Sequence, residues 1–376
     1  MLAHISVLTP DYPSPAGLIA DEVYVGDLDD YNAVMELAED TDVLSYEIEH
    51  VNTAALHDLE CSGRNVIPPS FVLGLIKDKM LQKKMLDRAG IPTAAWREVP
   101  EAGMIDSLLR EAEALGGFPL VQKARRGGYD GRGVCVLDSA EAEFLPVPSF
   151  LEKKVPIQKE LAVICVMDAS GSVRTYPCVE MVFDPRANLC DSVLMPARID
   201  EALMKKAEGL ALAVVEALKT ELADYCSQVT KKEPRYAPVM AGVFAVELFL
   251  DTSGNILVNE IAPRPHNSGH VTIENCVTSQ FMQYYRILSG YPLGSTEMVC
   301  PAMMVNLLGE ADASGEPSYV GIEEALKIPG VFLHLYGKSE VRPFRKMGHL
   351  TAIAPTVHEA IRRAELAREK IRIVSL

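Results

Sequence analysis

Two apolar runs joined by a short polar segment constrain the fold of this chain most strongly. The first run, VFAVELFL, covers residues 243–250, and the second contains VNEIA at residues 258–262. Between them lies DTSGN, a segment rich in turn-forming residues. We therefore predict that the two runs pair as antiparallel neighbours in a hairpin. In that hairpin Glu247 and Glu260 can point the same way from an otherwise apolar face.

A pair of carboxylates on one apolar face predicts a cation site. Two such groups repel one another unless a hard cation lies between them, and Mg²⁺ bound to substrate phosphates is the usual one. For a single acid, a buried carboxylate paired with a nearby arginine is an equally good interpretation. The pair is followed at once by Arg264, His266 and Asn267 in the stretch APRPHNSGH. That combination favours the metal site.

The bulk composition excludes several classes of protein. The chain has 376 residues, enough for two or three domains, and its 36 basic against 52 acidic residues give a net charge of −16. This charge argues against a nucleic-acid or anionic-membrane partner. Eight cysteines without a CxxC pair suggest neither a zinc site nor a disulfide framework, and reduced thiols fit a cytoplasmic protein. The sequence shows no long apolar span and no signal peptide.

Strand and helix signals alternate near the N-terminus, which favours an α/β fold with a parallel sheet. There we predict a strand at 4–8, a helix at 31–39 and a strand at 42–46. A basic amphipathic helix at 77–89 and a helix at 104–115 follow, then strands at 119–124 and 134–137. Residues 149–182 are strand-rich, 202–222 are helical, and the polar segment 224–235 is interpreted as a surface insertion. After a helix at 278–288, a strand-rich region leads to a charged helix at 357–373.

A glycine-rich loop, ARRGGYDGRG, joins two of these strands at residues 124–133. Its glycines let backbone N–H groups approach an anion closely. No helix follows the loop and the GxxxxGK[ST] order is absent, so it is neither a Walker motif nor a dinucleotide fingerprint. We interpret it as a flexible lid over a triphosphate, with Lys123 and Lys79 as phosphate ligands. The alternative is a surface hairpin, but an aromatic and two charged residues inside the loop are hard to explain by folding alone: Tyr129, Asp130 and Arg132.

The stretch LEKKVPIQKEL, residues 151–161, combines acids with an extended link. An extended backbone can bind the edge of adenine, and a carboxylate can accept hydrogen bonds from ribose hydroxyls. Glu152 and Glu160 are the candidate acids. Taken alone, the stretch is more simply interpreted as a solvated run of charges.

Taken in order along the chain, several motifs resemble one family, the ATP-grasp 5-(carboxyamino)imidazole ribonucleotide synthetases of purine biosynthesis. They are SPAGLIADE, DVLSYEIEHVN, KDKMLQKKML, GGYDGRG, VFAVELFL, NEIAPRPHNSGH, TSQF and KSEVRPFRKMGHL. The resemblance implies an α/β ATP-grasp fold. It places an N-terminal parallel-sheet domain at 1–75 and an ATP-grasp domain at 76–290, with a small lid subdomain at about 95–155. A strand-rich C-terminal region at 291–376 completes the active site.

The resemblance also implies a reaction. ATP phosphorylates bicarbonate to carboxyphosphate, whose carboxyl group passes to the exocyclic amine of aminoimidazole ribonucleotide, releasing ADP and phosphate. ATP and Mg²⁺ are the implied cofactors, and a cytoplasmic homodimer that binds no nucleic acid and no membrane is the implied assembly.

Site residues carry over by position. The ATP contacts are Lys79, Lys123, Glu152 at the adenine hinge, the backbone of Lys154 and Val155, Glu160 at the ribose, and Asn259; the Mg²⁺ ligands are Glu247 and Glu260. The region of the ribonucleotide and bicarbonate comprises Tyr129, Asp130, Arg132, Arg264, His266, Asn267, Lys338 and Arg345. Among these, Asp130, Arg264, His266 and Asn267 are expected to be catalytic, with Asp130 accepting the proton from the amine.

The chain departs from the family at its start. Family members open with a strand and a glycine-rich loop, whereas here Met1–Leu2–Ala3 lead directly into HISVLTP, which looks like the family's second strand. We therefore expect the N-terminal sheet to lack its first strand and to have exposed edges. Two alternatives to the synthetase remain: another ATP-grasp ligase, such as a formate-using transformylase or a biotin-dependent carboxylase subunit, and an inactive nucleotide-binding remnant acting as a partner subunit.

Overall fold

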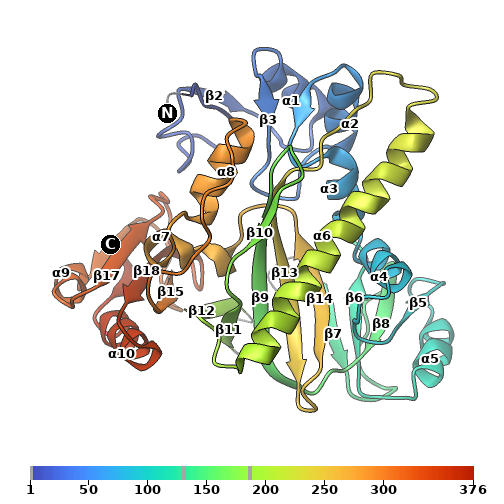
Figure 1. Cartoon of the computed structure of the whole chain (residues 1–376). Helices are drawn as coiled ribbons and strands as arrows, with labels where there is room; N and C mark the ends of the chain where they lie inside the picture. Colours follow the sequence, from blue (N-terminus) through green and yellow to red (C-terminus); the bar gives the residue numbers. More distant parts are fainter. Residues whose placement is uncertain (1–2, 129–132, 185–188) are drawn as a thin grey trace.

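The computed structural model describes residues 3–128, 133–184 and 189–376, shown in Figure 1. Its N-terminal part holds two separate parallel strand pairs, β1 with β2 and β3 with β4. Among the described residues β1 and β3 are not paired with each other, so the expected parallel sheet is split in two. The predicted strand, helix and strand are each found within a few residues. The elements are β1 (Ser6–Thr9), β2 (Glu22–Val25), α1 (Tyr31–Ala38), β3 (Val43–Leu44), α2 (Thr53–Cys61), β4 (Asn65–Val66) and α3 (Ser70–Lys77).

A small antiparallel sheet follows, in the order β5-β8-β6-β7, and the helix α5 packs against β5. It lies in the stretch that we predict as a lid, and the predicted helix and strands there are confirmed. The elements are α4 (Lys79–Arg88), β5 (Trp96–Val99), α5 (Ile105–Ala114), β6 (Leu120–Ala124), β7 (Val134–Leu137) and β8 (Ser149–Lys153). The basic helix predicted at 77–89 begins only at Lys79, because the Asp78 side chain caps α4 by accepting hydrogen bonds from the backbone N–H groups of Met80 and Leu81.

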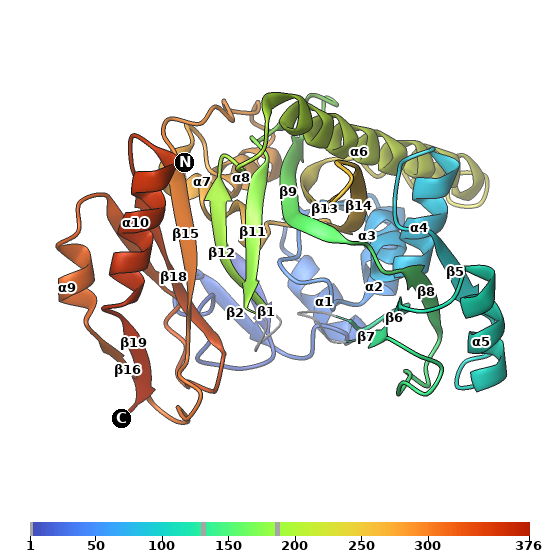
Figure 2. The same cartoon turned by 90° about the horizontal axis from the view of Figure 1, so that it is seen from below.

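The largest sheet in the described residues has nine strands, in the order β14-β13-β9-β11-β12-β15-β18-β17, with β10 also paired to β9. Its neighbours are all antiparallel, and the pairing of β12 with β15 carries the sheet into the C-terminal region without a break (Figure 2). The strands are β9 (Ile157–Met167), β10 (Val173–Thr175), β11 (Val179–Asp184), β12 (Leu189–Met195), β13 (Gly242–Asp251), β14 (Ile256–Ala262), β15 (Ala302–Leu308), β17 (Val331–Leu335) and β18 (Lys346–Ile353).

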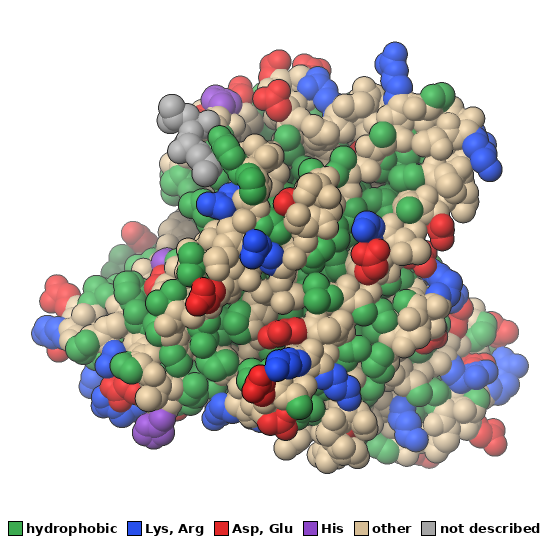
Figure 3. Space-filling model, in the orientation of Figure 1, with side chains coloured by type: hydrophobic (Ala, Val, Ile, Leu, Met, Phe, Trp, Pro, Cys, Tyr) green, Lys and Arg blue, Asp and Glu red, His purple; other side chains and the backbone are tan. Residues whose placement is uncertain are grey.

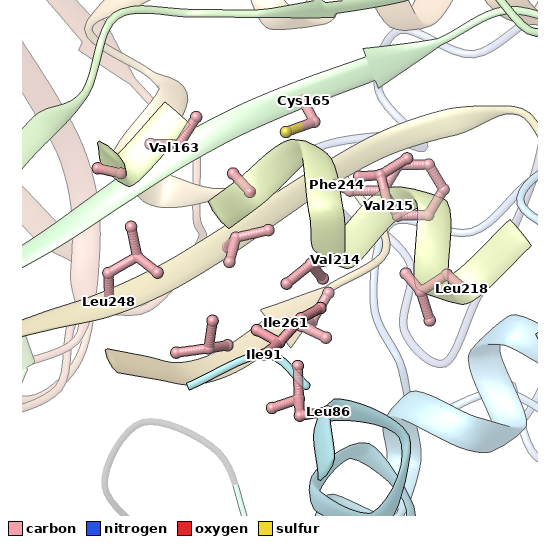
Figure 4. Packing of buried hydrophobic residues seen from close by; sticks show 14 of the residues in the cluster. Leu86, Ile91, Val163, Cys165, Val214, Val215, Leu218, Phe244, Leu248 and Ile261 are labelled. Carbon is pink, nitrogen blue, oxygen red and sulfur yellow. The ribbon is translucent and has the colours of Figure 1, made fainter. Parts of the chain in front are cut away.

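The long helix α6 (Glu201–Val229) crosses one face of this sheet (Figure 1). Its buried residues Val214, Val215 and Leu218 pack with strand residues such as Phe244 and Leu248 (Figure 4). Burial of this apolar stripe is what holds the helix on the sheet.

The interpretation of residues 224–235 as a polar surface segment is confirmed for residues 230–235, which are exposed, and is wrong for the first residues, which still belong to a helix. Helix α6 continues to Val229, and Tyr225 near its end stacks on Phe71 of α3 with ring centroids 4.3 Å apart. Tyr236 is only 1% exposed. Tyr225 within the segment and Tyr236 just after it anchor an otherwise polar stretch, because an aromatic ring buries a large apolar area even among charged neighbours.

In the C-terminal region, α10 packs against β15 and β18, and β16 pairs with β19. The charged helix predicted to 373 therefore ends earlier, and the last residues form a strand. The remaining elements are the 3₁₀ turn Asn267–Gly269, α7 (Thr272–Asn275), α8 (Gln280–Leu288), β16 (Pro317–Val320), α9 (Ile322–Leu326), α10 (Val357–Arg368) and β19 (Arg372–Ser375).

The surface is of mixed charge. On the face drawn in Figure 3, acidic and basic side chains are interspersed. Within the described residues, no helix has both the length and the apolarity needed to cross a bilayer.

Candidate active site

The predicted hairpin of β13 and β14 is confirmed, and Glu247 lies directly opposite Glu260 in its register. Residues directly opposite in an antiparallel pair share one face of the sheet, with Cβ atoms about 5 Å apart. A bulge follows immediately, between Glu247 and Leu248. At the turn, the Asp251 carboxylate accepts hydrogen bonds from the backbone N–H groups of Ser253 and Asn255, at 2.8 and 2.7 Å. This turn fixes the register that brings the two glutamates together.

Within the described residues, one lysine is paired with the two carboxylates of the hairpin. Burial, followed by the charges of Glu260 and Glu160, raises the pKa of Glu247 to about 8. One cation lies against the pair: Lys79 Nζ donates to Glu260 Oε2 at 2.8 Å. Burial opposes the charge on Lys79, but Glu260 and its neighbours still raise the pKa of the lysine. The site therefore stabilises additional positive charge.

Neutral groups contact the other glutamate. Asn259 Nδ2 lies 3.4 Å from Glu247 Oε2, and His266 Nε2 lies 3.4 Å from Glu247 Oε1. Burial, and then the charges of Arg264 and Lys346, lower the pKa of His266 to about 3. The imidazole is thus neutral near pH 7 and neutralises none of the charge on Glu247.

The N-terminus of α4 connects the hairpin to the start of the glycine-rich loop. Asp78, which is fully buried, forms an ion pair with Arg125 at 2.7 Å, and the backbone N–H of Lys79 donates to the carbonyl of Arg125. The loop therefore leaves the sheet beside Lys79. The predicted loop residues Tyr129, Asp130 and Arg132 lie outside the described residues.

Lys123 and Glu152 are in contact in the small sheet. Glu152, only 3% exposed, lies 2.8 Å from Lys123 Nζ and 2.5 Å from Lys83 Nζ. Sequence reasoning missed Lys83. A signal was present, because Lys83 follows Lys79 by four residues on the same helix, and that spacing places two side chains on one helical face.

The proposed adenine hinge lies between β8 and β9. The Lys154 side chain is exposed and reaches Asp138 at 3.5 Å, while Val155 is half-buried. Glu160 lies in β9. Burial raises its pKa, and the charge of Lys123 limits that rise. Glu160 thus faces the same charged region as Lys123 and Glu247, whereas the side chain of Lys154 is directed to Asp138.

The segment after β14 is held by a buried glutamine. Gln280 accepts a hydrogen bond from the backbone N–H of His266 at 3.0 Å and donates to its carbonyl at 2.8 Å. A Cβ at Gly269 would collide with the Gln280 side chain, so glycine is required there. Asn267 forms a reciprocal amide pair with Asn306 of β15, at 3.0 and 2.8 Å. The segment is therefore preorganised against the C-terminal part of the sheet.

Two acids of the N-terminal part reach the same place and were missed. Glu49 Oε1 lies 3.2 Å from Arg264 Nε, and burial raises the pKa of Glu49 and of Glu47 against the nearby charge of Arg264. The sequence contained part of the signal for them. Both follow the predicted strand at 42–46, and ligand sites in parallel sheets form beyond the carboxyl ends of the strands.

The predicted C-terminal cations differ in their surroundings. Lys338 donates to the carbonyl of Lys346 at 2.7 Å and lies near enough to Glu47 to lower its pKa. Arg345 donates to the carbonyl of Glu340 at 2.7 Å. Lys338 is thus linked to the acids of the site, and Arg345 is linked to its own loop.

The hairpin fits a Mg²⁺ ion that shares its coordination with phosphates. In the part of the chain that the structure describes, no group of three or more His, Cys, Asp or Glu residues could hold a metal by itself. Mg²⁺ commonly takes one or two carboxylates and completes its shell with phosphate oxygens and water. Glu247 and Glu260 supply such a pair, and the raised pKa of Glu247 marks the missing positive charge.

Comparison with known proteins decides the family. The ribonucleotide synthetase preATP-grasp domain matches residues 1–77, the ATP-grasp domain matches 84–281, and the phosphoribosylaminoimidazole carboxylase C-terminal domain matches 302–363. The N5-carboxyaminoimidazole ribonucleotide synthase of Synechococcus elongatus is 37% identical over 92% of this chain and 82% of its own length. The chain belongs to this synthase family. Its fold is the ATP-grasp fold.

Other relatives extend the comparison. The phosphoribosylaminoimidazole carboxylase of Ogataea methanolica is 39% identical over 91% of this chain, which spans 60% of that longer protein. The synthetase structure from Thermotoga maritima has a TM-score of 0.84 and 41% identity, covering 99% of this chain and 92% of its own. The Aspergillus clavatus synthase, solved with ADP and 5-aminoimidazole ribonucleotide, has a TM-score of 0.80 and 33% identity, covering 95% and 89%.

Proposed function

We propose that this chain carboxylates 5-aminoimidazole ribonucleotide with bicarbonate, using ATP and releasing ADP and phosphate. Family membership supports the reaction class, and the observation that carries the proposal is the register pairing of Glu247 with Glu260 beside Lys79. Phosphoryl transfer depends on cations around the transferred group far more than on a covalent nucleophile. A carboxylate pair with unneutralised charge, next to lysines, is the protein's part of such a site.

The first half of the active site would bind ATP and Mg²⁺. Glu247 and Glu260 would hold Mg²⁺, which when bound neutralises charge on the phosphate oxygens. Lys79, 2.8 Å from Glu260, and Lys123, 2.9 Å from Asn259, would bind phosphate oxygens directly. The backbone at residues 154 and 155 would bind the adenine edge. Glu160 would accept hydrogen bonds from the ribose.

The second half of the active site would bind bicarbonate and the ribonucleotide. Arg264, held by Glu49, would orient bicarbonate, while His266 and Asn267 would contribute neutral hydrogen-bonding groups. Lys338 and Arg345 would bind the phosphate of the ribonucleotide, with Tyr129 and Arg132 closing over it. Asp130 would accept the proton from the exocyclic amine as the new C–N bond forms. Carboxyphosphate hydrolyses readily, so closure of the glycine-rich loop would exclude water.

The proposal extends to the setting of the enzyme. All eight cysteines are free thiols in the structure, which supports a reducing, cytoplasmic environment. We also infer a homodimer by analogy with the family, and sedimentation of the purified chain checks this directly.

The decisive experiment measures phosphate release from ATP by the purified chain. The proposal requires release that depends jointly on bicarbonate and aminoimidazole ribonucleotide. Dependence on another carboxylate or amine would indicate a different ATP-grasp ligase, and nucleotide binding without turnover would indicate an inactive partner subunit.

Two variants separate the proposed roles. Glu260→Ala removes a Mg²⁺ ligand, so ATP turnover should fall by about 100-fold or more. Asp130→Ala should retain ATP binding and lose carboxylation, because it removes only the proton acceptor. Glu201→Ala is the control, since that exposed acid is paired with Lys205 on α6, away from the hairpin. Equal loss of nucleotide binding in the Glu260 and Asp130 variants would contradict these roles.

A further inference from the structure

Lys83, on α4, is almost completely buried and lies inside a chain of polar contacts. It is 2% exposed, and its Nζ lies 2.5 Å from Glu152 Oε1. The same ammonium contacts the hydroxyl of Thr93, which in turn donates to the carbonyl of Val258 at 2.7 Å. Lys83 is therefore fixed to the small sheet by one contact and to β14 of the large sheet by the other.

The chain of contacts continues from Glu152 to the carboxylate pair. Glu152 Oε2 binds Lys123 Nζ at 2.8 Å, and that same nitrogen donates to Asn259 Oδ1 at 2.9 Å. Asn259 Nδ2 then lies 3.4 Å from Glu247 Oε2. A continuous series of side chains thus runs from α4, through the small sheet, to the proposed Mg²⁺ ligand.

The charges along this series do not cancel within it. Lys83 and Lys123, both protonated, carry two positive charges against the one negative charge of Glu152; burial lowers the pKa of Lys83, and the charge of Glu152 opposes that shift. Burial acts to raise the pKa of Glu152, but Lys123 and Lys83 together hold it below its ordinary value. If Lys83 were absent, Glu152 would be neutralised by Lys123 alone. The positive charge of Lys123 would then be fully used in a buried ion pair with Glu152, and none would remain to attract phosphate.

We propose that Lys83 is a positioning residue for ATP: it neutralises Glu152 so that the charge of Lys123 remains available to the phosphates of the nucleotide. This inference rests on the proposed function only for the identity of the nucleotide as ATP. Lys83 itself touches no substrate, because its ammonium is enclosed by Glu152 and Thr93.

A purely structural role for Lys83 would have a different signature. In that case its removal would lower the free energy of unfolding and leave the folded protein with unchanged affinity for ATP. Under the proposal, ATP affinity and turnover change in the folded protein, because a tightened pair between Lys123 and Glu152 competes with phosphate. The two possibilities are separated by measuring binding and stability on the same variants.

The first experiment compares Lys83→Met with Lys84→Met. Lys84 is the neighbouring residue on α4 and forms an exposed ion pair with Glu98 at 3.3 Å. Lys84→Met therefore makes the same chemical change at a residue that lies outside the buried series. Lys83→Met should weaken ATP binding in calorimetry, and lower kcat at saturating ATP, by about tenfold to 100-fold. Lys83→Arg, which keeps the charge, should retain most of the affinity, and Lys84→Met should match the wild type.

The second experiment is a rescue. Adding Glu152→Gln to Lys83→Met removes the charge that captures Lys123 but keeps a polar side chain of the same shape at the hinge, so ATP affinity should recover by at least about tenfold. Lower stability with unchanged ATP affinity in Lys83→Met would overturn the inference. So would a double variant that regains stability but no affinity for ATP.

These outcomes are independent of the reaction itself. ATP binding is measured without bicarbonate or aminoimidazole ribonucleotide. If the wild type binds ATP yet shows no phosphate release that depends on both substrates, the proposed function fails while the role of Lys83 is still decided by the binding data.

Discussion

A buried acid and a half-buried pair of acids, linked through Lys123 and Asn259, have opposite electrostatic surroundings in this protein. Glu152 is enclosed by Lys83 and Lys123, which hold its pKa below the ordinary value. Glu247 faces Glu260, Lys79 is the one lysine paired with them among the described residues, and the pKa of Glu247 is raised to about 8. The first acid is satisfied by the chain's own cations. The second is stabilised only by a proton or by an added cation, which is what a site for an external cation requires.

The difference shows how an ion-pair network and a ligand site can be told apart. Removing one partner of a buried, matched carboxylate leaves an uncompensated charge and lowers the free energy of unfolding strongly. A carboxylate pair without enough partners costs free energy in the folded protein itself, and that cost is recovered when a cation binds. Stability and function should therefore respond in opposite ways to mutation at the two places.

The largest expected contrast is between Glu152→Ala and Glu247→Ala. Removing Glu152 leaves two lysines unpaired in a buried region and should lower the free energy of unfolding by about 3–5 kcal/mol. Removing Glu247 relieves repulsion with Glu260, so the free energy of unfolding should stay within about 1 kcal/mol of the wild type or rise. Turnover of ATP should nevertheless be lost in Glu247→Ala. Urea unfolding in the absence of Mg²⁺ makes the comparison, and equal destabilisation by both substitutions would refute it.

The pH dependence of stability gives a smaller effect with a definite sign. Glu247 has an ordinary pKa of 4.5 and a value of about 8 in the folded protein, so the folded state binds its proton more tightly. Its contribution to stability is therefore complete below pH 4.5 and is lost as the pH rises toward 8. Glu152 contributes with the opposite sign, because its pKa is lowered in the folded state.

The response of stability to Mg²⁺ tests whether the proton is bound by Glu247. A cation competes with the proton on Glu247, so the rise in Tm caused by Mg²⁺ should be larger at about pH 8 than at about pH 6. Glu247→Gln should abolish the pH dependence of this Mg²⁺ effect. Thermal unfolding with and without Mg²⁺ at both pH values provides the measurement, and a Mg²⁺ effect that persists unchanged in the variant would place the cation elsewhere.

The sequence predicts one of these two places better than the other. The hairpin of Glu247 and Glu260 follows from local signals, because apolar runs and a turn of Asp, Ser, Gly and Asn specify pairing between neighbours in the chain. The partners of Glu152 come from α4 and β6, and no local pattern states that Lys83 and Lys123 meet at one carboxylate. Pairing across elements depends on tertiary packing, which periodicity does not encode.

The same limit explains the other departures. Tyr225 lies in the polar segment and Tyr236 directly follows it, and an average over composition masks such single aromatic anchors. Glu47 and Glu49 reach Arg264 only because the N-terminal part packs beside the hairpin. The resemblance to the synthetases supplied the order of motifs and the fold, while the contacts between motifs required the structure.

The smallest expected effect concerns the turn that holds the two glutamates in register. Asp251 accepts hydrogen bonds from the backbone of Ser253 and Asn255 and from the Asn255 side chain, so Asp251→Ala should lower Tm by a few degrees. Asp168 makes a comparable turn between β9 and β10, accepting from the backbone of Ser170 and Ser172 at 2.9 and 3.1 Å, and that turn carries none of the proposed site residues.

Asp168→Ala is therefore a matched control for Asp251→Ala. Both substitutions should cost similar stability in thermal unfolding, because each removes the acceptor that organises a short turn. Only Asp251→Ala should also weaken the stabilisation by Mg²⁺, since it loosens the register that places Glu247 opposite Glu260. Should both variants retain the full Mg²⁺ effect, the register of the hairpin would not be what creates the cation site, and the contrast with Glu152 would then rest on charge alone.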